Sequence, residues 1–278
     1  MATTTVRQSS AHAYLPREHG ATAMMLTPFF CAAILLRHVY WQEAVALVAI
    51  VVALVIKDPL VVIARQRWIW KQKHAETDAA RRAAVTEILL LAAAGAALLL
   101  SAQDWHPLTA LFVASAAFTV LAVAVNVQNR QRSVWFQVVS AVALSGTSIA
   151  ACLAGPGRVP AWCWMLWGLC ALQATAGIFV VHARLDARVA SRKGGHTHSA
   201  NRGAAILVQV ILMLTAATFS ASGRYWIAAA LAVAACFYLL DLRRQRASAS
   251  LQMSLKSVGQ QALTLSIAFA ILIIIGLW

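Results

Sequence analysis

The stretch KDPLVVIARQRWIWKQKHAETDAARR, residues Lys57–Arg82, decides how the rest of the chain is interpreted. It carries seven Lys or Arg residues against three acids, and it follows the uncharged apolar run Val45–Ile56. Short loops rich in Lys and Arg beside a membrane span stay on the cytoplasmic side of the membrane. The stretch therefore predicts a cytoplasmic segment that follows a transmembrane helix.

The composition supports a membrane protein. Of the 278 residues, 61% are hydrophobic and only 12% are charged, whereas a soluble chain is about half apolar and a quarter charged. So little polar surface excludes a soluble domain. We expect a cytoplasmic tail over residues 1–20 and a single polytopic transmembrane domain over residues 21–278, in a bacterial-type cytoplasmic membrane.

Nine segments are apolar enough to cross a bilayer, which takes about 20 residues of helix. We therefore predict an all-α membrane protein with about nine transmembrane helices. The first segment is the shortest and contains Pro28, so a bent or partly inserted helix is expected there. The predicted spans are Ala21–Leu36, Glu43–Ala64, Ala84–Ser101, Leu108–Val125, Val134–Ala154, Trp162–His182, Ala204–Ala221, Tyr225–Leu240 and Gly259–Trp278.

The positive charges follow this alternation. With the Lys57–Arg82 loop inside, the outer turns hold only Arg37, Arg158 and Arg224 of the 23 Lys and Arg residues. The bias predicts a cytoplasmic N-terminus and an external C-terminus. It also accounts for the net charge of +14, because basic residues at the inner surface face anionic lipid. The expected partner is the lipid bilayer, and no nucleic-acid partner is expected.

Polar side chains that could bind a ligand gather at the inner ends of the even-numbered spans. Lys57 and Asp58 form a charged pair at the inner boundary of span two, where charges are costly unless they are paired or hydrated. Arginine binds phosphate through a planar pair of donors, although positive-inside bias alone also explains arginine at these ends. The candidate ligand-binding residues are Lys57, Asp58, Arg65, Asn129, Arg130, His182, Arg184 and Asp186.

The opening of the chain resembles a known family. Pro16–Gly20 reads ProArgGluHisGly, and an apolar run leads from there to Pro28. This pattern, His-Gly followed by small and apolar residues and then Pro, is similar to the start of the YwiC-like membrane proteins. The resemblance implies a membrane fold and names no reaction.

The helix layout also resembles the UbiA superfamily of intramembrane prenyltransferases, which carry an aspartate-rich motif on the cytoplasmic ends of helices two and six. This resemblance implies two four-helix halves plus one helix. Of the motif Asn-Asp-x-x-Asp-x-x-x-Asp only Asp58 is present, and of Asp-x-x-x-Asp only Asp186. A Mg²⁺ ion that bridges a diphosphate needs several carboxylates. We therefore expect no metal site, no cofactor and no Mg²⁺-dependent prenyl transfer.

The favoured function is the binding of an anionic lipid or isoprenoid diphosphate at the cytoplasmic ends of helices two and six. Three alternatives stay open, namely a divergent UbiA-like prenyltransferase, an assembly subunit of a membrane complex and a transporter. Mg²⁺-dependent ligand binding would favour the first and a co-purifying protein the second. A transporter would need polar residues in the middle of the membrane.

Reporter fusions test the predicted topology. Because basic residues gather on one side, fusions at Lys73, Ser191 and Ala249 are expected to report cytoplasm, and fusions at Gly157 and Trp278 the opposite side. A cytoplasmic signal from the Trp278 fusion would mean an even number of spans and would break the alternation.

Overall fold

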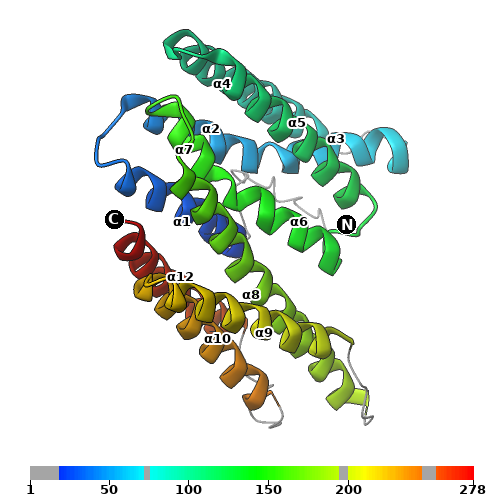
Figure 1. The fold of residues 1–278 in the computed structure, drawn as a ribbon. Coiled ribbons are helices and arrows are strands. Elements are labelled where there is room, and N and C mark those ends of the chain that lie inside the picture. Colours follow the sequence, from blue (N-terminus) through cyan, green and yellow to red (C-terminus); the bar gives the residue numbers. More distant parts are fainter. Residues whose placement is uncertain (1–18, 72–75, 194–199, 246–254) are drawn as a thin grey trace.

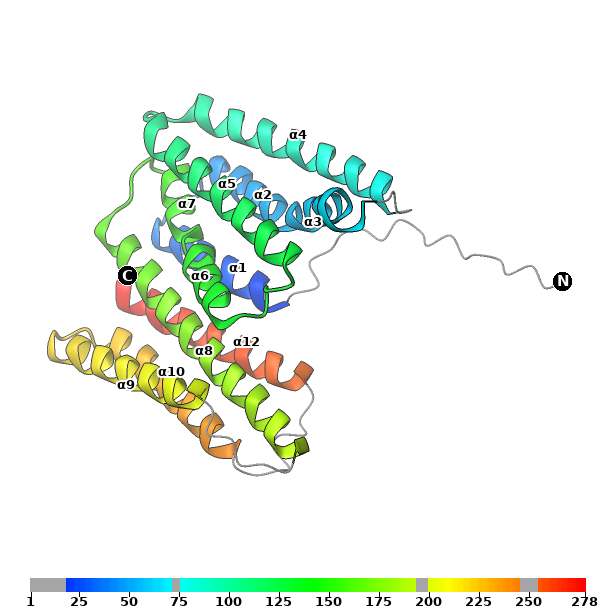
Figure 2. The same ribbon diagram turned by 90° about the vertical axis from the view of Figure 1, so that its right-hand side faces the viewer.

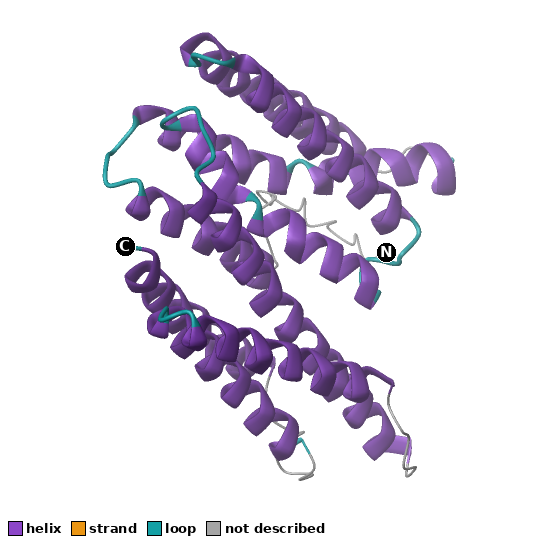
Figure 3. Cartoon of the chain, viewed as in Figure 1, coloured by secondary structure: helices purple, strands orange, loops and turns teal. Residues whose placement is uncertain are grey.

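The computed structural model describes residues 19–71, 76–193, 200–245 and 255–278 (Figure 1). All regular structure in these residues is helical (Figure 3). The helices in chain order are α1 (His19–Leu35), α2 (Trp41–Val55), α3 (Lys57–Arg65), the π-helix η1 (Gln66–Trp70), α4 (Thr77–Ser101), α5 (Trp105–Val127), α6 (Val134–Ser145), α7 (Thr147–Ala154), α8 (Ala161–Lys193), α9 (Ala200–Ala221), α10 (Tyr225–Arg244) and α12 (Leu255–Leu277).

Each of the nine predicted spans coincides with a helical segment. Eight segments in the described residues are long and apolar enough to cross a membrane, and the first, Thr22–Leu35, is shorter. The chain is therefore an all-helical, multi-pass membrane protein. The predicted tail, residues 1–20, lies outside the described residues except for the start of α1 at His19. Which side of the membrane each end of the chain faces stays a prediction.

One predicted boundary is wrong by several turns. Span six was expected to end at His182, but α8 continues to Lys193. The extension is rich in Ala and Arg, which are strong helix formers. It carries charges past the apolar part of the span, and α9 and α10 pack on the same helix.

Helix α1 lies in the middle of the molecule (Figures 1 and 2). It packs on α6, α7, α8 and α12. Helices α2 to α5 lie on one side of this central group, and α9 and α10 lie on the other, against α8 and α12. Met25 and Phe29 of α1 are almost fully buried. The shortest of the predicted spans is therefore packed against protein over much of its surface, with Phe30 and Ile34 exposed, and such packing is how an undersized and Pro-containing segment is tolerated in a bilayer.

The fifth span is broken at Gly146, where α6 ends and α7 begins. The hydroxyl of Thr147, the first residue of α7, donates to the carbonyl oxygen of Met25 in α1 at 2.6 Å. Pro28 lacks an N–H, so the carbonyl oxygen of Met24, four residues earlier, has no helical donor, and the bond from Thr147 goes to the neighbouring carbonyl of Met25. On the other side of the break, the indole of Trp167 donates to the Val142 carbonyl oxygen at 2.9 Å. The break in α6–α7 is thus tied to α1 and to α8.

Glycines let α10 approach its neighbours closely. A Cβ on Gly177 of α8 would lie 2.8 Å from the hydroxyl oxygen of Tyr238 in α10. A Cβ on Gly276 of α12 would lie 2.7 Å from a side-chain carbon of Ile227, at the opposite end of α10. Small residues at such crossings are typical of membrane helix packing, because dispersion contacts replace the hydrophobic effect there.

The Thr147 contact gives a stability prediction. Thr147→Val removes a buried interhelical hydrogen bond and keeps the side-chain shape, so it should lower the free energy of unfolding by about 1–2 kcal/mol. The matched control is Thr218→Val, since the exposed Thr218 donates only within its own helix, to Thr215. Unfolding in mixed micelles measures both variants. Equal stabilities would show that the link to Met25 contributes nothing.

Candidate functional site

Arg65, at the end of α3, binds the end of α5. Its Nη2 donates to the carbonyl oxygen of Asn126 and to Oδ1 of Asn129, both at 2.7 Å. Asn129 has a left-handed backbone, with φ of 55°, and the amide of Arg130 donates back to the Val125 carbonyl at 3.0 Å. This is a Schellman-type helix end, in which Asn is a frequent substitute for Gly. Arg65 therefore completes the cap of α5.

The arginines around this cap differ in how far they are engaged by protein. Arg65 is half-buried and uses one of its nitrogens for the two bonds. Arg130 is exposed, and no side-chain hydrogen bond or ion pair is found for it among the described residues. Its guanidinium fork is thus available to an anion from solvent or lipid.

Two glutamines flank the cap with buried oxygens. Gln66 follows Arg65, and Gln131 follows Arg130, each in the middle of an Arg-Gln-Arg tripeptide. The Oε1 atoms of both are buried and have no hydrogen-bond donor in the described part of the chain. A buried acceptor without a donor is costly. The basic end of α3 and α5 therefore combines free donors on arginine with unused acceptors on glutamine.

Lys57 and Asp58 open α3, directly after the break that separates it from α2 at Ile56. Both side chains are half-buried and both interact with other groups. Asp58 is close enough to Glu87 of α4 for the two carboxylates to interact electrostatically. Asp58 therefore faces the α4 side of the molecule.

The remaining candidates lie on α8 and contact other helices. Arg184 is 2% exposed and forms an ion pair with Asp241 of α10. The ring of His182 lies 3.1 Å from Oε1 of Gln137 in α6. Asp186 accepts a hydrogen bond of 2.8 Å from Asn201 of α9.

The candidate residues therefore form two groups rather than one. Arg65, Asn129 and Arg130 lie where α3 meets α5, whereas Arg184 and Asp186 lie where α8 meets α9 and α10. Helix α3 packs on α4 and α5, and α8 packs on α6, α9 and α10. In both views the α3 end and the α8 end point to separate parts of the molecule (Figures 1 and 2).

The candidate list omitted the partners that hold these groups. Gln245 of the third Arg-Gln-Arg tripeptide donates to Asp241 Oδ2 at 2.9 Å and to the Val180 carbonyl oxygen at 3.3 Å. Asp241 and Gln245 are four residues apart, so one helix face presents both. That spacing is visible in the sequence. Gln137 and Asn201 gave no such signal, because their roles depend on which helices pack together.

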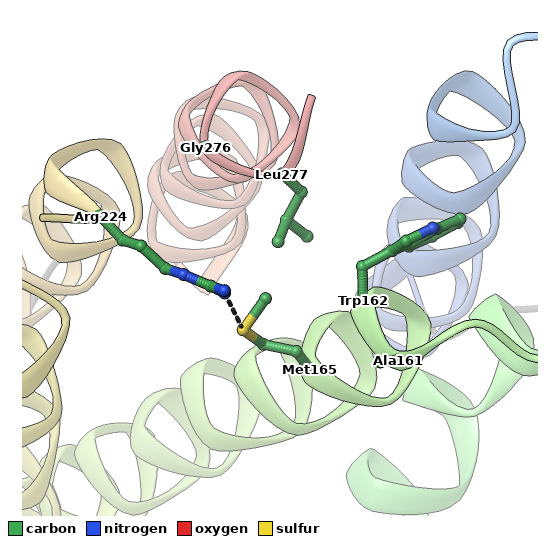
Figure 4. Close-up of a pocket in the computed structure, with 6 residues that line it drawn as sticks. All are labelled: Ala161, Trp162, Met165, Arg224, Gly276 and Leu277. Atoms are coloured by element: carbon green, nitrogen blue, oxygen red, sulfur yellow. Dashed lines mark hydrogen bonds between the residues drawn. The ribbon is translucent and has the colours of Figure 1, made fainter. Parts of the chain in front are cut away.

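A shallow pocket of about 520 Å³ lies at the other end of the helices (Figure 4). Trp162 and Met165 of α8, Arg224 before α10 and Leu277 of α12 line it. The guanidinium of Arg224 points across the pocket to the Met165 sulfur, at 3.2 Å. A thioether is a weak acceptor, and Arg224 is exposed. This pocket holds none of the candidate residues.

The comparison with family models matches residues 15–152 to the YwiC-like protein family. The N-terminal half of this chain is therefore similar to that family. The resemblance predicted from His19, Gly20 and Pro28 is confirmed over that range. No curated protein and no solved structure matches the chain significantly, and the UbiA-like layout stays a prediction.

The YwiC-like region divides the two groups of candidates. It contains α1 to α6 and ends within α7, so it includes the α3–α5 group and the contact between Thr147 and Met25. The α8–α10 group lies beyond residue 152. The half of the chain that matches the family thus holds Arg130, for which no side-chain partner is found among the described residues.

The ion pair between Arg184 and Asp241 gives a second stability prediction. Arg184→Met should destabilise the fold by up to about 3 kcal/mol, because it leaves the half-buried carboxylate of Asp241 with only its hydrogen bond from Gln245. The double variant Arg184→Met/Asp241→Leu should recover most of that loss, since both charges are gone. A double-mutant cycle in micelles measures the coupling. Strictly additive losses of stability from the two single variants would contradict a coupling between Arg184 and Asp241.

Proposed function

We propose that this multi-pass protein binds the anionic headgroup of a lipid at the basic end of α3 and α5, on the cytoplasmic face of a cytoplasmic membrane. The observation that carries the proposal is the guanidinium of Arg65, which is held at the α5 cap by Asn126 and Asn129, while Arg130 of the same cap has no side-chain partner in the described part of the chain. A phosphate is recognised by paired donors from arginine. Arg65 is held in place by Asn126 and Asn129, so little side-chain entropy is lost when it binds.

The elements around this end favour a lipid over a soluble anion. Trp68, Ile69 and Trp70 of η1 are all exposed, directly after Arg65 and Arg67. Tryptophans on basic segments sit at the level of lipid headgroups. A phosphate bound at Arg65 and Arg130 would therefore lie in the headgroup layer, with its acyl chains beside exposed apolar side chains.

The orphan oxygens of Gln66 and Gln131 point to the kind of headgroup. They need donors, and a phosphate alone supplies only acceptors. A headgroup that carries hydroxyl groups beside its phosphate supplies both. We therefore favour a hydroxylated anionic lipid, such as a phosphatidylglycerol, as the bound class. An isoprenoid diphosphate has the anion without the hydroxyl groups and is the second candidate.

The other roles have less support in the geometry. A UbiA-like arrangement would need Asp58 and Asp186 to face one substrate, but Asp58 lies beside α4 and Asp186 is bonded to α9. An assembly role rests on no particular contact. We therefore favour binding between the ends of spans two and four, and binding between the ends of spans two and six stays a prediction.

Arg130→Gln is the sharpest test, because Arg130 has no side-chain bond within the described residues. Its loss should leave the melting temperature unchanged and weaken binding of phosphatidylglycerol about fivefold, the equivalent of about 1 kcal/mol per interfacial charge. Arg65→Lys should weaken binding as well and also lower stability, because lysine cannot keep both bonds to the α5 cap. Native mass spectrometry at fixed detergent and salt measures the bound lipid.

The matched control is Arg192→Lys, an exposed arginine on the last turns of α8. Arg192→Lys should change neither the melting temperature nor the amount of bound lipid. Phosphatidylglycerol, a prenyl diphosphate and inorganic phosphate are compared as probes. Equal lipid retention by wild type, Arg65→Lys and Arg130→Gln would reject the proposal and leave these arginines a role in topology alone.

A further inference from the structure

A second polar region lies inside the membrane-spanning part of α8, α9 and α10, away from the α3–α5 end. Gln173 and Gln209 are buried there, and the buried Gln245 directly follows the end of α10. Tyr238 of α10, which is 6% exposed, contacts Gln173 through its hydroxyl. Buried polar groups in membrane helices face the protein interior and often mark functional positions.

Gln173 and Tyr238 define the middle of this region. Nε2 of Gln173 donates to the Tyr238 hydroxyl at 3.0 Å, and that hydroxyl donates to the Gln173 carbonyl oxygen at 3.4 Å. Gly177, one turn further along α8, leaves the space in which the hydroxyl sits, since a Cβ there would be 2.8 Å from it. The packing of α8 on α10 therefore makes room for a polar group.

Gln209 of α9 is the polar residue of this region whose side-chain hydrogen bonds are not accounted for. It is 1% exposed, and neither its Nε2 nor its Oε1 has a hydrogen-bond partner in the described residues. Its helix neighbours Ala205 and Leu212 are 0% exposed, so this face of α9 points into the bundle. Gln209 and Tyr238 lie about equally far from the turn at Gly223 that joins α9 to α10, which puts them at one depth, roughly 20 Å along each helix.

A carboxamide with both atoms unsatisfied is unfavourable in a low-dielectric interior. A water molecule offers donors and acceptors together and is typically held by two to four polar groups. We propose that Gln209, Gln173 and Tyr238 bind a water molecule between α8, α9 and α10, at mid-membrane depth. Asp241, Arg184 and Gln245 continue the polar region toward the basic end, so the water exchanges from that side.

Hydroxyl-radical labelling by X-ray radiolysis tests this in the wild-type protein in phosphatidylcholine vesicles, because radicals form from bound water. Tyr225, which is 68% exposed, is the reference for a ring in contact with water, and Phe269, which is 2% exposed, is the reference for a ring shielded from water. Tyr238 should label many-fold faster than Phe269 despite its burial. Labelling of Tyr238 as slow as that of Phe269 overturns the proposal.

The variant arm assigns the water to Gln209. Gln209→Leu should reduce Tyr238 labelling several-fold, and the exposed Gln260→Leu should not change it. Gln209→Met, closer in shape, replaces Gln209→Leu where the latter fails to fold. Unchanged Tyr238 labelling in a folded Gln209 variant, or a raised melting temperature with unchanged labelling, means that Gln209 is only an unsatisfied group and overturns the assignment.

Discussion

Hydrocarbon offers no hydrogen-bond partner, so each interruption of a helix must be completed by protein. The structure meets this constraint with side-chain donors from neighbouring helices. Thr147 donates to the Met25 carbonyl beside Pro28. Arg65 does the same for Asn126 at the end of α5. These contacts fix which helices are neighbours, and the short central helix α1 depends on them most directly.

The same constraint separates arginines with structural roles from those open to a ligand. Arg184 is buried and paired with Asp241, so its charge is already neutralised by protein. Arg65 caps α5 with one guanidinium nitrogen, Nη2, and its remaining N–H donors can still bind an anion. Arg130 is exposed at the same cap. Positive-inside bias explains why all three lie at one end, and the contacts explain why only the last two are suited to a headgroup.

Much of the helical architecture was predictable, because hydropathy in a bilayer is a strong signal. The spans, the short first helix with its Pro28, and the YwiC-like opening at His19 and Gly20 were all found from the sequence. The grouping of the candidate residues was not, because it depends on lateral packing, to which hydropathy is blind. Asp58 and Asp186 have equivalent places on spans two and six, yet α3 packs on α4 and α5 while α8 packs on α9 and α10.

The register of α8 against α10 shows how strongly the inner polar groups are constrained. Gln173 contacts Tyr238 and Gln245 contacts Val180, each across a sequence separation of 65. Arg184 and Asp241 are separated by only 57, so the guanidinium reaches back along α10. A lone arginine near a membrane boundary extends toward the headgroups, whereas Arg184 extends toward the middle of the membrane. Such an orientation is tolerable only where a carboxylate and further polar groups receive the charge, and it draws the polar region of α8, α9 and α10 inward from the basic end.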